Sequence, residues 1–292
     1  MNRTKGPAHG PGMVGRAMSR LPAKSKLLWP LYLAKQLYRT EYTVSSQLLP
    51  AAFDGMKLVF VSDIHYGSFF DSERLSDLVT RVNAEDADAV LLGGDYGEDS
   101  KAALDMWSSL KPCFKAREGV YAVLGNHDVS EFSLIHPLMD AIEAAGGRAM
   151  GNRVVYLQRG GECLAICGTE ECYFGNPDLP ALERLSSDAP YRILLSHSPD
   201  ILPDYEDGLN ENENAFFQLF LCGHTHGGQV AIMGKPLLSS SMYGDRYTAG
   251  MKEERGACVI VSAGVGTSAL PVRFGTKPEY NVITLRSKAM KP

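Results

Sequence analysis

Lys57–His65 has the sequence KLVFVSDIH, a pattern that recurs along the chain. Residues 58–61 form a continuous apolar run that contains two valines. Such a run, bounded by polar residues, is typical of a strand buried on both faces. Asp63 and His65 come directly after it, and side chains of these types are seldom buried without a partner. The stretch therefore predicts a central strand that ends at a chemically active site.

Seven further short apolar runs follow the same pattern, and four helical patterns lie among them. The predicted strands are Lys57–Ser62, Ala89–Leu92, Val120–Leu124, Cys163–Cys167, Arg192–Ser196, Phe216–Cys222, Ala257–Ser262 and Val282–Leu285. The predicted helices are Ser72–Asn83, Lys101–Leu110, Ser133–Ala145 and Leu179–Ser186. Strands interleaved with helices indicate a layered α/β domain in which helices cover one or more sheets.

Polar side chains follow five of the eight predicted strands. They are Asp63, His65, Asp95, Asn126, His127, Asp128, His197, His224 and His226. Because sheets present binding groups at their strand ends, we expect these residues to converge on one cleft. Residues two apart on an extended segment point the same way, so Asp63 and His65 should face one site together. The same argument applies to His224 and His226.

The chemistry of these side chains favours metal ions. Seven of them offer nitrogen or oxygen ligands: Asp63, His65, Asp95, Asn126, His197, His224 and His226. Seven ligands exceed what one tetrahedral zinc ion uses. They suit two adjacent divalent ions that share a carboxylate, an arrangement that serves phosphoryl displacement. Mixed imidazole and carboxylate ligands favour Mn, Fe or Zn over Ca or Mg.

These residues fall into five short blocks, whose order along the chain is informative. Asp63-x-His65, Gly94-Asp95, Gly125-Asn126-His127-Asp128, His197 and Gly223-His224-Thr225-His226 resemble the five-block signature of calcineurin-like metallophosphoesterases. Further on, Asp245-Arg246-Tyr247 and Gly264-Val265-Gly266 precede Arg273, which is similar to the bacterial YaeI/YkuE-type phosphodiesterase branch. The resemblance implies a four-layer α-β-β-α sandwich.

The same resemblance implies a role for each residue. Asp63, His65, Asp95 and His226 would hold one divalent ion, and Asp95, Asn126, His197 and His224 the other. His127 would stabilise the transition state or protonate the leaving oxygen, and Asp128 would orient the imidazole of His127.

Two arginines in the tail are candidates for substrate binding. Arg246 and Arg273 would clamp a phosphate through paired N–H donors, or else they are surface arginines. The acidic segment Asp204–Glu213 lies between two of the ligand blocks. It is either a solvated connection or an element that shapes substrate choice.

The charge of the chain is unevenly distributed. Residues 1–40 carry eight of the 29 basic side chains, whereas all 34 acidic residues come later. We therefore divide the chain into a basic arm, residues 1–50, and a catalytic domain, residues 51–292. A basic arm on an acidic body suggests an anionic partner. The body has no basic stripe with interleaved aromatic residues, so we expect no specific nucleic-acid binding.

The arm contains one apolar segment, Leu27–Ala34, after residues 1–26, whose composition predicts disorder. Eight apolar residues are too few to span a bilayer. They favour a segment that lies in the membrane interface, with Trp29, Tyr32 and Tyr38 at headgroup depth, or a helix packed on the domain itself. The sequence shows no twin arginine, and no small-residue cleavage site follows Ala34, which disfavours an export signal.

The six cysteines are scattered, which is typical of thiols in a reducing compartment. We therefore expect a cytoplasmic protein that contacts the inner face of the membrane through residues 1–40. The function that fits best is hydrolysis of a phosphodiester or pyrophosphate bond in a lipid-linked or membrane-proximal substrate. One alternative is a nucleotide or nucleic-acid phosphodiesterase. The other is a non-catalytic scaffold of the same fold, which predicts missing ligands.

Overall fold

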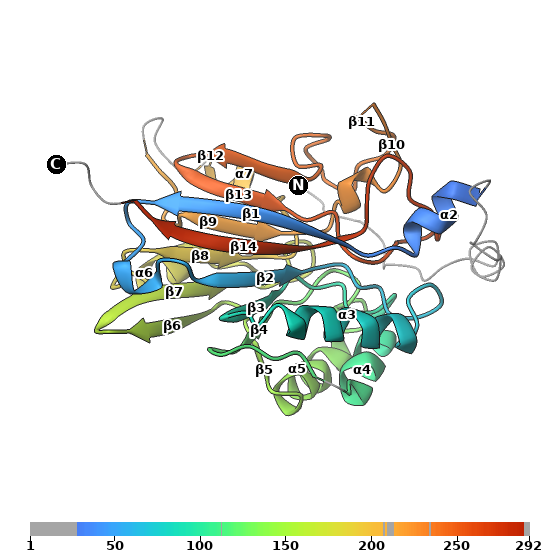
Figure 1. The fold of residues 1–292 in the computed structure, drawn as a ribbon, viewed down its shortest axis with the longest axis horizontal. Helices are drawn as coiled ribbons and strands as arrows, with labels where there is room; N and C mark the ends of the chain where they lie inside the picture. The colour runs from blue at the N-terminus through green and yellow to red at the C-terminus, as the bar shows by residue number, and fades with distance from the viewer. Residues whose placement is uncertain (1–27, 112, 207, 209–212, 234, 289–292) are drawn as a thin grey trace.

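The computed structural model describes residues 28–111, 113–206, 208, 213–233 and 235–288, in which strands and helices alternate (Figure 1). The strands are β1 Tyr38–Ser46, β2 Lys57–Val61, β3 Ala89–Leu92, β4 Val120–Ala122, β5 Gly147–Ala149, β6 Arg153–Arg159, β7 Glu162–Gly168, β8 Arg192–Leu195, β9 Leu219–Cys222, β10 Ala231–Ile232, β11 Lys235–Pro236, β12 Gly250–Glu254, β13 Ala257–Val261 and β14 Glu279–Ser287.

The described residues also form six α-helices and three short 3-10 helices. The α-helices are α2 Trp29–Ala34, α3 Ser72–Ala84, α4 Ser100–Ser109, α5 Ile135–Ala144, α6 Leu179–Leu185 and α7 Ile201–Glu206. The 3-10 helices are η2 Ala51–Phe53, η3 Phe132–Leu134 and η4 His226–Gly228. Pairing between β10 and β11 makes a separate two-stranded sheet.

The other strands form two six-stranded sheets. The first has the order β1-β14-β2-β3-β4-β5, and the second has the order β12-β13-β9-β8-β7-β6. In the first sheet β2, β3 and β4 are parallel, and in the second β7, β8 and β9 are parallel. Parallel neighbours end at the same edge of a sheet, so the segments that follow each set of strands leave the sheet side by side.

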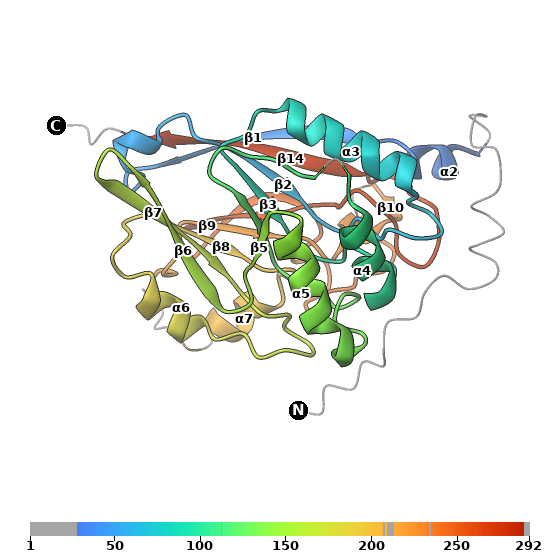
Figure 2. The same cartoon turned by 90° about the horizontal axis from the view of Figure 1, so that it is seen from below.

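Alternate side chains of each strand enter different cores. Leu58 and Phe60 of β2 lie in the core between the two sheets, whereas Val59 and Val61 pack in a core that includes residues of α3, α4 and α5. On the second sheet, Leu194 of β8 packs with residues of α6 and α7. Figures 1 and 2 show the resulting layers, with helices outside both sheets. The predicted four-layer α-β-β-α sandwich is confirmed.

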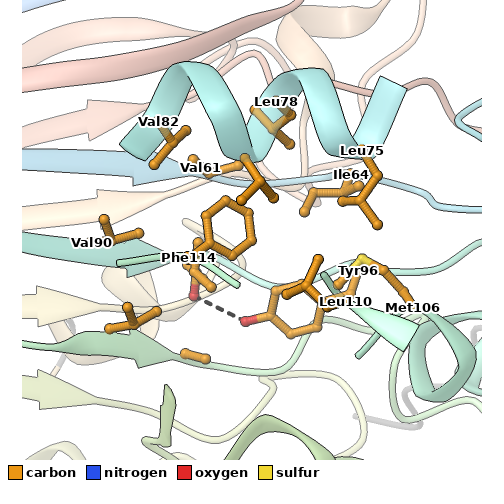
Figure 3. Packing of buried hydrophobic residues seen from close by; sticks show 14 of the residues in the cluster. Val61, Ile64, Leu75, Leu78, Val82, Val90, Tyr96, Met106, Leu110 and Phe114 are labelled. Atoms are coloured by element: carbon orange, nitrogen blue, oxygen red, sulfur yellow. Dashed lines mark hydrogen bonds between the residues drawn. The ribbon is translucent and has the colours of Figure 1, made fainter. Parts of the chain in front are cut away.

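The helix layer over the first sheet illustrates why these segments are helical. In α3 the apolar residues Leu75, Leu78 and Val82 recur at helical spacing and face Val61 of β2 (Figure 3). The helix begins at a cap, because the carboxylate of Asp71 accepts the backbone N–H three residues later at 3.0 Å. Full burial of each such leucine or valine contributes about 1.5–3 kcal/mol.

The eight predicted strands are the eight interior strands of the two sheets. The prediction omitted the four edge strands β1, β5, β6 and β12. Each edge strand pairs on one side only, and β1 and β12 mix polar or charged residues with apolar ones, so these two lack an apolar run. β5 has only three residues, whereas β6 contains the apolar run 154–157, which the prediction missed. The largest omission is β1, which we placed in the basic arm. It pairs with β14 along all nine of its residues, so Tyr38–Ser46 belongs to the sheet.

The segment before β1 forms the short helix α2. Its Leu31 and Leu33 are buried against the domain, whereas Trp29 is exposed. Within the described residues, no helix combines the length and the apolar character that crossing a bilayer requires. Residues 1–26, for which we predicted disorder, lie outside the described residues. All six cysteines are present as thiols.

The role of β1 predicts a difference between two shortened chains. A chain that begins at Ala51 lacks β1 and the buried side chains of Leu31, Leu33 and Val44. We expect it to lose at least about 5 kcal/mol of stability, which lowers Tm by about 10 °C or more relative to a chain that begins at Leu28. Thermal unfolding followed by circular dichroism measures this difference. Equal Tm values would show that residues 28–50 contribute nothing to the domain.

Candidate metal centre

The candidate site lies where the parallel strands of both sheets end. Asp63 and His65 follow β2, and Asp95 follows β3 of the same sheet. His197 follows β8 and His224 follows β9, which belong to the second sheet. Each of these side chains is buried. The two sheets therefore each supply ligands to one place.

On one side of the site, single ligand atoms of Asp63, His65 and His226 lie within 4.8 Å of one another. Nε2 of His226 is 3.0 Å from Nε2 of His65 and 3.5 Å from Oδ1 of Asp63. Two imidazole nitrogens and a carboxylate oxygen that face one point are a typical ligand set for a divalent transition-metal ion.

A second group of ligand atoms lies beside the first. Asp95, His197 and His224 also offer atoms within 4.8 Å of one another. Nε2 of His197 is 3.2 Å from Nδ1 of His224 and 3.2 Å from Oδ1 of Asn126. The structure therefore brings Asn126 to this side of the site.

Asp95 belongs to both sides. Its Oδ2 atom is 3.4 Å from Nε2 of His197 and 3.6 Å from Nε2 of His65. One carboxylate oxygen thus faces the histidines of both groups, which is the arrangement that two ions sharing a ligand require. The donor set fits a dinuclear divalent metal site.

Hydrogen bonds orient two of the imidazoles for metal binding. Nδ1 of His197 donates to the carbonyl of Gly93 at 2.7 Å, and Nε2 of His224 is 3.3 Å from the carbonyl of Ser240. Because a carbonyl only accepts, the opposite ring nitrogen of each histidine is the one that offers a lone pair to a cation once it carries no proton. Both of those nitrogens point into the site.

Burial and charge set the protonation of the site. Burial lowers the pKa of His65 to about 3 and that of His226 well below its usual value, so both are neutral at pH 7. Burial also acts against a proton on His197, but the adjacent Asp95 outweighs it and raises the pKa of His197 to about 10. The carboxylate of Asp95 thus attracts positive charge. Protons therefore compete with cations for this site.

The backbone that carries the ligands is turned rather than extended. Five of the predicted ligands have a positive φ, between 49° and 69°: Asp63, His65, Asp95, His224 and His226. Our expectation that Asp63–His65 and His224–His226 are extended segments is therefore wrong. A left-handed conformation costs a non-glycine residue about 1–3 kcal/mol. Residues in this conformation cluster at functional sites. Because the turns are tight, His224 and His226 of one loop can belong to different ligand groups.

Glycines allow the ligand loops to approach closely. A Cβ atom at Gly125 would lie 2.2 Å from Oδ1 of Asp95, and one at Gly223 would lie 2.3 Å from Oδ2 of Asp63. Both distances are far shorter than a van der Waals contact. Any larger residue at either position would displace a carboxylate of the site.

His127 is partly exposed at the edge of the site, whereas Asp128 is fully buried. Nε2 of His127 is 4.0 Å from Oδ2 of Asp95. We expected Asp128 to orient the imidazole of His127, but Nδ1 of His127 donates instead to the carbonyl of Glu98 at 2.9 Å. The buried carboxylate of Asp128 accepts the backbone N–H groups of Asp95, Tyr96 and Gly125. Asp128 therefore joins the loops that follow β3 and β4.

Arg273 is fully buried beside the site. Its guanidinium group donates to the carbonyls of Gly264, Gly266 and His226, and one Nη atom is 3.3 Å from Nδ1 of His226. Gly266 in turn donates its N–H to the carbonyl of Asp63. In this structure the donors of Arg273 bind the protein's own loops, so its role here is to join the segments that carry His226 and Asp63.

Arg246 forms ion pairs at the surface. It contacts Glu206 at 2.7 Å and also pairs with Glu254. Glu206 ends helix α7, so the first part of the acidic segment Asp204–Glu213 is helical. Residues 209–212 of that segment lie outside the described residues.

Tyr173 also contacts the site, although no sequence pattern singled it out. Its hydroxyl group is 3.2 Å from Nε2 of His224 and donates to the carboxylate of Asp200 at 2.6 Å. Tyr173 lies in the segment after β7, at the same edge of the sheet as the segments after β8 and β9. The strand-end pattern that drew attention to His197 therefore also pointed to this segment, but its residues did not match a ligand block.

Comparison with known proteins identifies the family of this chain. A profile of the calcineurin-like phosphoesterase family matches residues 56–228, a span that contains all seven predicted ligands. The chain belongs to the calcineurin-like phosphoesterase family, and it is a metal-dependent phosphoric ester hydrolase.

Individual relatives cover most of the chain. The uncharacterized metallophosphoesterase YkuE of Bacillus subtilis is 30% identical over 260 residues, which are 85% of each chain. Phosphodiesterase YaeI of Escherichia coli is 27% identical over 237 residues, which are 78% of this chain and 82% of YaeI. The solved structure of an archaeal phosphodiesterase is 15% identical, with a TM-score of 0.35 over 72% of this chain and 85% of that one.

The position of Asp95 predicts the effect of its removal. In Asp95→Ala, both ligand groups lose their shared oxygen, so we expect bound metal to fall from two ions per chain to fewer than one. Elemental analysis of the purified protein measures this. Asp140→Ala, which changes an exposed carboxylate on α5, is the control and should keep both ions. Full occupancy in Asp95→Ala would contradict the shared-ligand assignment.

The buried position of Arg273 predicts a loss of both stability and metal. In Arg273→Leu the carbonyls of Gly264, Gly266 and His226 lose their donor, and each unsatisfied buried acceptor costs about 1–3 kcal/mol. We expect a loss of about 3 kcal/mol or more and weaker metal binding, measured by denaturant unfolding and metal titration. Arg246→Leu, at an exposed ion pair, should cost about 1 kcal/mol or less. If Arg273→Leu instead kept its stability and raised only KM, Arg273 would be a substrate clamp.

Proposed function

We propose that this hydrolase cleaves a phosphodiester or pyrophosphate bond with two divalent ions held by Asp63, His65, Asp95, Asn126, His197, His224 and His226. The proposal rests on the position of the Oδ2 atom of Asp95. This atom lies within 3.6 Å of histidine nitrogens from both ligand groups. Two ions bound there would activate water and bind the phosphate oxygens. Imidazole and carboxylate ligands favour Mn, Fe or Zn for these positions.

His127 is the proposed catalytic residue. Its Nδ1–H bond to the carbonyl of Glu98 fixes the ring, so Nε2 is the nitrogen available to the substrate. A protonated His127 donates this Nε2 proton to the oxygen that leaves phosphorus, or stabilises the negative charge that develops there. Asp128 contributes indirectly, because its carboxylate holds the backbone of Asp95 and Gly125.

The substrate we propose is lipid-linked or lies close to a membrane, at the inner face of the cytoplasmic membrane. Residues 1–40 carry eight basic side chains and no acidic one, which favours contact with an anionic surface. The name of the relative YaeI supports a diester rather than a monoester. The acidic body argues against specific nucleic-acid binding.

The test is hydrolysis of bis-p-nitrophenyl phosphate, a diester, beside p-nitrophenyl phosphate, a monoester. We expect chelation to abolish activity and Mn²⁺, Fe²⁺ or Zn²⁺ to restore it, with the diester cleaved faster. The measurement is the release of p-nitrophenolate. Absence of activity with every metal, together with absence of bound metal, would support the scaffold alternative.

The same assay tests His127. In His127→Ala we expect bound metal to be retained and kcat for the diester to fall roughly 10²–10⁴-fold, because a general acid is lost. His136→Ala, which changes an exposed histidine of α5, is the matched control and should keep full activity. Near-normal turnover in His127→Ala would remove this residue from the mechanism.

A further inference from the structure

Large apolar side chains are exposed on three segments beside the metal centre. We call this set the apolar rim: Trp29, Ile232, Met233, Leu237, Leu238 and Phe274. Met233 is 98% exposed, Leu238 82% and Leu237 60%. Single exposed apolar residues are common, but a contiguous group marks an interaction surface.

Hydrogen bonds join the three segments of the rim. The backbone of Ala231 in β10 donates to the carbonyl of Phe274 at 2.7 Å. The backbone of Arg273 donates to the carbonyl of Pro30 in α2 at 3.0 Å. In both views, α2 and β10 lie toward the same end of the molecule (Figures 1 and 2). The rim is therefore one connected region of the fold.

The rim is attached to the metal centre at both ends of its longest segment. Helix η4, which begins at His226, leads into β10. After β11 the chain returns to the site, where the carbonyl of Ser240 lies 3.3 Å from Nε2 of His224. A surface bound to the rim would thus lie next to the ligands of the site.

The charge of the adjacent chain indicates which surface fits. Residues 1–27 lead directly into α2 and carry six basic side chains and no acidic one. Lys235 lies within the rim segment and is exposed. Apolar side chains accompanied by basic residues are the pattern of proteins that enter the interface of an anionic bilayer.

We propose that the apolar rim inserts into the headgroup and acyl boundary of an anionic bilayer. Met233, Leu237 and Leu238 enter the apolar layer, and Trp29 lies at headgroup depth, where aromatic rings gather. The metal centre then faces phosphates at the bilayer surface. This last step, which makes the substrate a membrane-borne phosphodiester, rests on the proposed function.

The test uses the full chain and two double variants. In the rim variant, Met233→Glu is combined with Leu238→Glu. In the control variant, Leu48→Glu is combined with Leu185→Glu, since these side chains are 52% and 54% exposed. Leu185 ends α6, which lies toward the opposite end of the molecule from β10 in both views. The control thus adds the same charge away from the rim.

Flotation with vesicles measures binding. The vesicles are phosphatidylcholine alone, or phosphatidylcholine with about one third phosphatidylglycerol. We expect the unmodified chain and the control variant to bind the mixed vesicles. The affinity of the rim variant for these vesicles should be lower by about tenfold or more. All three should hydrolyse bis-p-nitrophenyl phosphate equally. Trp29 gives a second readout, because its fluorescence should shift to the blue on mixed vesicles and Trp29→Phe should remove that shift.

Several outcomes would contradict the proposal that the apolar rim enters a bilayer. Equal binding of the rim variant and the control, or binding of the unmodified chain to neither vesicle, excludes the rim as a membrane surface. If the chain self-associates and only the rim variant fails to do so, the apolar rim is a contact between copies of this chain. Hydrolysis of the soluble diester is scored separately, so loss of the proposed function and loss of the membrane surface are distinguished.

Discussion

The constraint on which the structure depends is the placement of the Asp95 carboxylate between two groups of buried histidines. Oδ2 faces His65 on one side and His197 on the other, while Oδ1 accepts the backbone N–H of His127 at 2.9 Å. Each histidine comes from a different sheet. The two sheets must therefore stack with their parallel strand ends aligned, and the inter-sheet core enforces that alignment.

Holding such a site is costly, and the protein offsets the cost with buried polar contacts. Burial raises the pKa of Asp63 to about 6, and five ligands occupy left-handed backbone. Asp128 and Arg273 offset these costs, because each joins two ligand-bearing segments through hydrogen bonds to backbone groups. Neither residue needs to touch a substrate to matter for function, since each positions candidate metal ligands.

Much of the site was predictable because its residues occupy a special place in the sequence. Interior strands are buried on both faces, which requires apolar runs, and polar residues directly after such runs stand out. The structure brings Asp63, His65, Asp95, His197 and His224 together within the two ligand groups. The hydrogen-bond partners of the histidines at the site were not predictable. Tyr173, Glu98 and Ser240 act through contacts far apart in the chain, for which no local pattern exists.

The eight interior strands, the layered α/β class and the identity of the side chains at the strand ends could all be predicted from the sequence alone. Each of these follows from local apolar periodicity. The four edge strands, the burial of Arg273 and the partners of Asp128 become visible only in the folded chain. An edge strand such as Tyr38–Ser46 is stabilised by its neighbour rather than by its own burial, and a buried arginine depends on carbonyls supplied by distant loops.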